Sequence, residues 1–187
     1  MKALSKASLW AKLLYEFIGT AFLVFAFNAG GRGTAYFLMW IIAYKVSGAH
    51  FNPATSLAVF IVERQPFKDF VTLFAYMGAQ FVGAFAGFGV AYLLVKDKRP
   101  TTSILLPSGA QYINPTTLDI YWGRPILLET TLTAVLTMAY LILHYDGGLA
   151  TKVDRVIKGL VMLVITQVCL VLSQGSGGCF NPAVGLA

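Results

Sequence analysis

The sequence has 187 residues, of which 57% are hydrophobic and 12% are charged. Charged residues make up about a quarter of a typical soluble domain, so this composition excludes an ordinary soluble globule. The mean hydropathy of +0.71 is too high for the small core of a chain this short, which indicates that much of its surface faces lipid. The net charge of +6 comes from Lys and Arg in short stretches between apolar runs, which argues against nucleic acid as a partner.

The apolar runs predict five membrane-spanning helices, because a spanning helix needs about 20 such residues. We expect them, with a short second helix, near residues 12–29, 33–46, 67–95, 125–144 and 155–174. Polar or basic connections are expected at 63–68, 96–124 and 146–158. In the third helix, Gly83 and Gly87 form a Gly-x-x-x-Gly pair, which predicts close packing against a neighbouring helix. The predicted fold class is therefore an all-α integral membrane protein.

The orientation follows from the basic residues. If the chain crosses the membrane at every helix, more Lys and Arg fall on the side of the N-terminus than on the other, which favours a cytoplasmic N-terminus. The basic N-terminal stretch also admits a secretory signal or a mitochondrial leader, with the mitochondrial inner membrane as an alternative location. The run from Phe17 onward is better used as a spanning helix. Which membrane holds the protein stays open.

An internal repeat divides the chain into two related halves. Ser-Gly-Ala-His-Phe-Asn-Pro-Ala, residues 47–54, reappears as Ser-Gly-Gly-Cys-Phe-Asn-Pro-Ala, residues 176–183. Glu-x-x-x-Thr-Ala-x-Leu occurs at Glu16 and again at Glu129, at the start of the first and fourth helices. We expect one membrane domain over residues 1–187, with a first repeat at 1–95 and an incomplete second repeat at 125–187. Because the first half contains an odd number of spanning helices, the second half enters the membrane from the opposite side and the repeat is inverted.

Each Asn-Pro-Ala predicts the start of a helix, since Asn is a preferred N-cap and Pro a preferred first helical residue. The apolar run after Asn52 ends at Val62 and would form about 15 Å of helix, half the thickness of a bilayer. A half-helix near residues 52–62 and another from residue 181 must therefore dip into the membrane and return. Such re-entrant backbone is stable only when it is buried in protein or lines an aqueous cavity.

With its paired Asn-Pro-Ala motifs, each preceded by Ser-Gly, the sequence resembles the aquaporin, or major intrinsic protein, family. The resemblance implies a passive channel for water and other small neutral solutes, without cofactor or metal, in a lipid bilayer. It implies that the side-chain amides of Asn52 and Asn181 donate hydrogen bonds to passing water, and that the opposed half-helix ends disfavour protons and cations. The remaining motif residues are Pro53, Ala54, Pro182 and Ala183. A homotetramer, or a place in a larger membrane complex, is the expected assembly.

Two acids inside predicted spanning helices and one histidine are further candidates. The resemblance implies that Glu16 and Glu129 brace the half-helix loops by accepting backbone hydrogen bonds. The alternative for Glu16 is that it reaches the membrane surface and pairs with Lys12, four residues earlier. We expect His50 to line the cytoplasmic vestibule, with a loop histidine bonded inside the protein as the alternative.

The selectivity filter departs from the family pattern. Where water and glycerol channels usually carry Arg directly after the second Asn-Pro-Ala, this sequence has Val184. An ungapped comparison places the other filter positions at Gly178, Cys169 and Arg32. Arg32 lies among glycines, which favours a solvated turn arginine over a filter residue. A filter without the guanidinium has a weaker barrier to cations, so the selectivity is in question.

The sequence ends at Ala187, six residues after Asn181, without a sixth spanning helix. We expect it to be a fragment, and a truncated protein whose open side is covered by another subunit is the alternative. A passive channel is the leading function. A non-conducting structural subunit and a secondary transporter are the alternatives, while the sequence contains none of the common catalytic motifs and does not indicate an enzyme.

Overall fold

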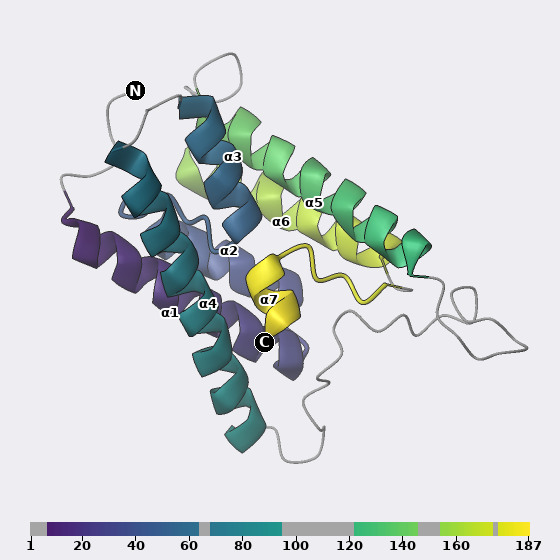
Figure 1. The fold of residues 1–187 in the computed structure, drawn as a ribbon. Coiled ribbons are helices and arrows are strands. Elements are labelled where there is room, and N and C mark those ends of the chain that lie inside the picture. Colours follow the sequence, from purple (N-terminus) through teal and green to yellow (C-terminus); the bar gives the residue numbers. More distant parts are fainter. Residues whose placement is uncertain (1–6, 64–67, 95–121, 146–153, 174–175) are drawn as a thin grey trace, which may run out of the picture.

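The structure is a computed structural model, and it describes residues 7–63, 68–94, 122–145, 154–173 and 176–187. In these ranges the secondary structure is helical, which confirms the predicted all-α class (Figure 1). The helices are α1 (Leu9–Ala29), α2 (Arg32–Ala43), α3 (Pro53–Glu63), α4 (Lys68–Leu94), α5 (Gly123–His144), α6 (Arg155–Leu172) and α7 (Pro182–Leu186). Most of the predicted connections at 63–68, 96–124 and 146–158 lie outside the described residues.

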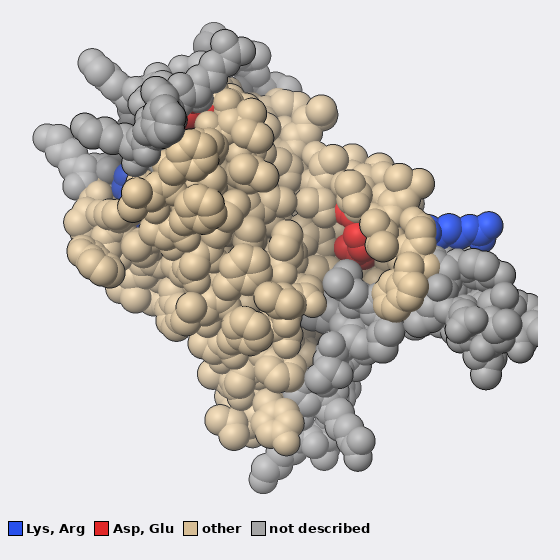
Figure 2. All heavy atoms as spheres, in the orientation of Figure 1, with Lys and Arg blue, Asp and Glu red and all other residues tan. Residues whose placement is uncertain are grey.

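The long helices are suited to lipid. In the described part, α1, α4, α5 and α6 are each long and apolar enough to cross a membrane, and many of their large apolar side chains point outward. The predicted short second helix is α2, whose 12 residues extend about 18 Å. Figure 2 shows a face on which Lys, Arg, Asp and Glu atoms are few. The chain is an integral membrane protein that crosses the bilayer several times.

Local signals explain where these helices begin and end. The Ser8 side chain accepts a hydrogen bond from Ala11 N at the start of α1, and Asp154 does the same for Val156 N at the start of α6. Gly30 ends α1 in the left-handed conformation, which glycine adopts without steric cost.

Helices α1 and α4 pack closely because two glycines of α4 face the backbone of α1. A Cβ atom at Gly83 would run into the carbonyl oxygen of Phe17, and one at Gly87 into that of Ala21. Gly78 and Gly89, on the same helix, have nothing within 4 Å of the corresponding position. The close packing predicted from the Gly-x-x-x-Gly pair is therefore confirmed.

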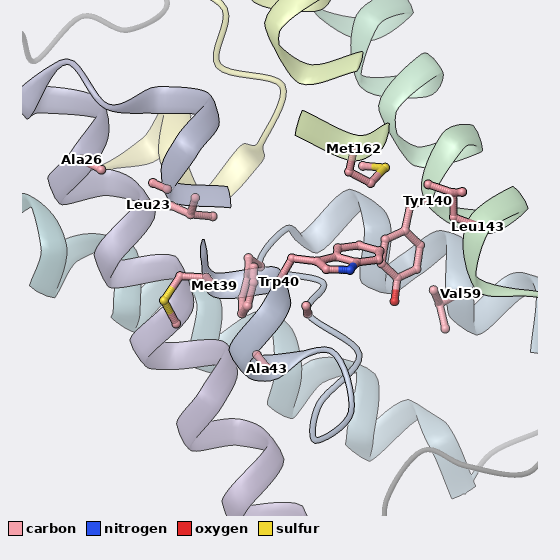
Figure 3. Close-up of a cluster of buried hydrophobic side chains, with 12 residues drawn as sticks. Leu23, Ala26, Met39, Trp40, Ala43, Val59, Tyr140, Leu143 and Met162 are labelled. Atoms are coloured by element: carbon pink, nitrogen blue, oxygen red, sulfur yellow. The ribbon is translucent and has the colours of Figure 1, made fainter. Parts of the chain in front are cut away.

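The main buried cluster lies where α2, α5 and the loop before α3 meet. Trp40 and Tyr140 are its largest members and are completely buried, and Phe51 and Ala49 of the loop are buried with them. Figure 3 shows Trp40 and Tyr140 next to each other, with Met162 nearby. This cluster holds the first repeated motif inside the bundle.

Candidate functional site

The two Asn-Pro-Ala motifs each cap a short helix. Asn52 Oδ1 accepts a hydrogen bond of 2.9 Å from Ala54 N, and Asn181 Oδ1 accepts one of 3.0 Å from Ala183 N. The prolines that follow need no hydrogen-bond partner at the first helical position, where their fixed φ is favourable. Both short helices, α3 and α7, thus begin as the sequence predicts.

The same two asparagines tie the halves of the chain together. Asn52 Nδ2 donates to the carbonyl of Phe180 at 2.8 Å, and Asn181 Nδ2 donates to the carbonyl of Phe51 at 2.7 Å. Figure 1 shows α3 and α7 leaving this meeting point in opposite directions. An amide nitrogen carries two hydrogens, so each asparagine keeps a second N–H beyond the one that holds the opposite loop.

The loops before the two motifs have the same strained backbone. Positive φ angles occur at Ala49 (56°) and Phe51 (50°) in the first loop and at Phe180 (52°) in the second, in addition to glycines. Each costs roughly 1–2 kcal/mol for a residue other than glycine. Such strain persists only where the surroundings impose it, and it concentrates at functional sites.

Glu16 supplies part of what imposes this shape on the first loop. Its carboxylate is completely buried and accepts hydrogen bonds from Ser47 Oγ (2.6 Å), His50 N (3.0 Å), Phe51 N (2.7 Å) and Gln80 Nε2 (2.9 Å). Because the side chain has no exposed surface, the alternative of an acid that reaches the membrane surface beside Lys12 is wrong. The geometry is that of a brace for the loop.

Glu129 makes the equivalent contacts in the second half. It accepts hydrogen bonds from Ser176 Oγ, from Gly178 N at 2.9 Å and from Phe180 N at 2.9 Å. The two acids therefore engage matching positions of the repeated sequence, the serine and the phenylalanine.

The sequence analysis missed Gln80, a buried polar residue of α4. Its Nε2 donates to Glu16 Oε2 and to Ser56 Oγ, both at 2.9 Å. A single amide inside an otherwise apolar spanning helix is the signal that could have identified it, because such groups need internal partners.

A cavity of about 60 Å³ lies against the paired asparagines. A buried water needs at least about 10–15 Å³ on this measure, so the cavity has room for several. It is lined by Leu23, Phe27, Tyr36, Asn52, Thr55, Leu136, Met162, Thr166, Leu170, Cys179, Phe180, Asn181 and Val184. The wall is mostly apolar, and none of these described residues carries a charge.

The structure separates the four filter candidates. Val184 lines the cavity, whereas Gly178 is engaged with Glu129 and Cys169 is buried in an apolar cluster with Leu132 and Phe180. Arg32 is the first residue of α2, and its side chain lies outside the described part of the structure.

Helix α6 faces the cavity with a different set of residues from the one predicted. Met162, Thr166 and Leu170 line it, at the four-residue spacing of one helical face, and Cys169 does not. The ungapped comparison chose Cys169, whereas the neighbouring residue, Leu170, is the one in the cavity wall.

His50 is buried in the loop before α3. Its Nδ1 is 3.1 Å from Ser56 Oγ, and its ring contacts those of Tyr76 and Tyr140. Among the described residues that line the cavity, His50 is missing. Its Nε2 has no hydrogen-bond partner among the described residues, and the role of His50 in a cytoplasmic vestibule stays a prediction.

The described residues hold no cluster of three or more His, Cys, Asp or Glu that could bind a metal ion. The chemistry of the site is therefore that of amides, hydroxyls and backbone groups at the wall of a small apolar cavity.

Comparison with known proteins agrees with this geometry. Residues 28–187 match the family model described as "Major intrinsic protein". The chain is 26% identical to Aquaporin-1 of Rhizopus delemar (92% of this chain, 63% of that one) and 30% identical to Aquaporin NIP1-1 of Zea mays (92% and 61%). It thus spans under two thirds of the length of these relatives.

A solved structure, that of the aquaglyceroporin from Plasmodium falciparum, superimposes with a TM-score of 0.73 at 23% identity, covering 96% of this chain and 79% of that one. This likeness confirms the predicted inverted-repeat bundle with two re-entrant half-helices. Since the family model covers most of the sequence, the chain belongs to the major intrinsic protein family.

Proposed function

We propose that the protein is a passive channel for water and for other small neutral solutes. The observation that carries this proposal is the pair of asparagines at the wall of the cavity, Asn52 and Asn181. Each uses its oxygen to cap a half-helix and one N–H to hold the opposite loop, which leaves one N–H as a donor for a solute. These N–H donors are fixed in place and replace the hydrogen bonds that a solute gives up when it leaves bulk water, so entry costs little free energy.

The character of the cavity wall supports a neutral solute. Water and polyols bind to isolated hydroxyl and amide groups, whereas an ion in an apolar cavity needs charged or multiple dipolar partners. A secondary transporter would be expected to place acidic or basic side chains at such a site, and the described lining of this cavity has no Asp, Glu, His, Lys or Arg. In this reading, Glu16 and Glu129 hold the loops and do not contact the solute.

Val184 is the residue that we expect to set selectivity. It lies in the cavity wall at the position where the resembled channels have Arg. A valine occupies less of the passage than a guanidinium and offers no donor, so solutes wider than water should enter. The substitution Val184→Arg should then reduce glycerol or urea flux more than water flux, and equal reductions would contradict this role.

The channel is tested by reconstituting the full-length protein in liposomes and following light scattering after an osmotic step. Vesicles that contain the protein should shrink faster than empty ones, with glycerol entry measured in the same way. If the wild type and variants with a widened passage, such as Val184→Ala and Tyr140→Val, all behave like empty vesicles, the proposal is wrong. The non-conducting structural subunit would then be the better description.

We further propose one domain of two inverted repeats, residues 1–95 and 125–187, that assembles in the bilayer as a homotetramer. The exposed apolar faces of the long helices would accommodate neighbouring subunits. Native mass spectrometry in a mild detergent tests the assembly. A tetramer supports it, whereas a monomer or a mixed complex with another protein favours the structural subunit.

A further inference from the structure

On α2, α5 and α6, the residues one turn beyond the cavity lining are large and buried. Tyr36 of α2, Leu136 of α5 and Met162 of α6 face it. One turn further, toward the end of the bundle where α2 and α5 finish and α6 begins, the corresponding residues are Trp40, Tyr140 and Lys158. Trp40 and Tyr140 have no exposed surface, and Lys158 is 7% exposed. Large side chains therefore fill this side of the bundle.

These residues belong to a continuous layer of rings, which we call the aromatic layer. It consists of Trp40, Tyr44, His50, Tyr76, Tyr140 and His144.

Tyr140 lies at the centre of the aromatic layer. Its ring centroid is 5.5 Å from that of Trp40, 5.4 Å from that of His50 and 5.3 Å from that of His144. Figure 3 shows the Trp40 and Tyr140 side chains extending toward each other from α2 and α5. On the same side, the Lys158 amine lies 5.9 Å from the centre of the Tyr44 ring.

Three tyrosine hydroxyls donate hydrogen bonds to three consecutive backbone carbonyls before the first Asn-Pro-Ala. Tyr76 donates to Ser47 O at 2.9 Å and Tyr140 donates to Gly48 O at 2.8 Å. Tyr36 makes a longer contact of 3.4 Å to Ala49 O. The donors come from α4, α5 and α2, so three separate helices converge on one stretch of loop.

The second loop is arranged differently. Its Cys179, Phe180 and Asn181 all line the cavity, whereas the first loop contributes only Asn52 among the described residues. The two halves of the repeat thus match in the acids that brace the loops and in the helix caps, but they differ in how much of each loop lines the cavity. A solute that reached the asparagines from the open half would meet protein on the other side.

We propose that the aromatic layer is a closure of the channel and that Tyr140 is the residue that holds it shut. Its ring fills the route, and its hydrogen bond to Gly48 O fixes the ring there and occupies an acceptor that a passing solute would use. Opening requires the Tyr140 side chain to leave this carbonyl. The closure rests on the proposed channel function and adds to it the place where flow is limited.

Two substitutions separate the roles of the ring and the hydroxyl. Tyr140→Phe keeps the ring and removes the hydroxyl that anchors it to Gly48 O. The closed form then loses one neutral hydrogen bond, so the osmotic water permeability should rise about two- to tenfold. Tyr140→Val removes both, and the permeability should rise by about tenfold or more. The matched controls are Tyr92→Phe and Tyr92→Val, because Tyr92 lies on α4 with two thirds of its surface exposed to lipid (67%).

All variants are measured as full-length protein in liposomes, with helical content and the fluorescence of the tryptophans checked first. A rise for both Tyr140 variants and none for the Tyr92 variants supports the closure. Wild-type permeability well above that of empty vesicles and equal to that of Tyr140→Val overturns the closure but leaves the channel intact. If the wild type and all Tyr140 variants behave like empty vesicles, the channel function fails and the closure with it. Should Tyr140→Val not fold, Tyr140→Phe alone decides, since an unchanged permeability would contradict the anchor.

Discussion

Replacing Glu16 with Gln should destabilise the protein far more than the same replacement of a surface glutamate. The two carboxylate oxygens accept four hydrogen bonds, Oε1 from Ser47 Oγ and His50 N, and Oε2 from Phe51 N and Gln80 Nε2. In the variant one oxygen remains, and the new NH₂ group faces two donors. Gln80 can turn its amide, because its Oε1 has no hydrogen-bond partner among the described residues. A backbone N–H cannot turn.

The expected loss of stability follows from the backbone N–H that is left without an acceptor. A buried N–H without an acceptor costs about 1–3 kcal/mol, and the surviving bonds lose the strength that the charge gave them. We expect Glu16→Gln to lower the free energy of unfolding by about 2–4 kcal/mol. The control is Glu63→Gln, since Glu63 is half-buried and accepts a hydrogen bond from the Tyr145 hydroxyl. Its cost should stay within about 0.5 kcal/mol.

The assay is unfolding by SDS in mixed detergent micelles, followed by the fluorescence of the three tryptophans. The two variants should be compared at the same lipid content and pH, so that only the brace differs. If Glu16→Gln and Glu63→Gln unfold at the same SDS fraction, Glu16 does not hold the loop and the reasoning is refuted.

Three further predictions use the same preparation. Asn181→Ala removes a helix cap and the hydrogen bond to the opposite loop, so it should lower the free energy of unfolding by about 2 kcal/mol and reduce water permeability. Unchanged stability would contradict the tie between the halves. Gly87→Ala should cost at least about 1–3 kcal/mol because the methyl meets backbone of α1, whereas Gly89→Ala should be neutral or gain up to about 1 kcal/mol, as measured in the same SDS titration. A small organomercurial should label Cys179, at the cavity wall, faster than Cys169 in its apolar cluster, as read by peptide mass spectrometry, and equal rates would argue against solvent in the cavity.

Motif chemistry made the half-helices predictable. An Asn before a Pro is a strong local signal for a helix start, and it placed α3 and α7 correctly because both the cap and the proline act within a few residues. The bracing role of Glu16 and Glu129 came from the family resemblance and from the recurrence of the acid in both halves, and in the structure both acids accept hydrogen bonds from the loops.

What the sequence could not predict depends on helix rotation and side-chain packing. Cys169 and Leu170 are neighbours in the chain, and only the rotation of α6 decides which of them faces the cavity. The aromatic layer was equally hidden, because Tyr140 and Gly48 are far apart in sequence. The end of α2 at Ala43 rather than at residue 46 reflects turn bonds from Val46 N and Ser47 N to Ala43 O, which lead the chain into the loop.

The reciprocal bonds between the two loops have a consequence for biosynthesis. Asn52 and its acceptor, the carbonyl of Phe180, are 128 residues apart. A ribosome adding 5–20 residues per second needs roughly 6–26 s to make the intervening chain. During that time the first re-entrant loop exists without its partner, and its polar groups have no place in hydrocarbon. The nascent loop therefore stays in water or against the insertion machinery. Synthesis of the second half then determines when the first loop reaches its final place in the membrane.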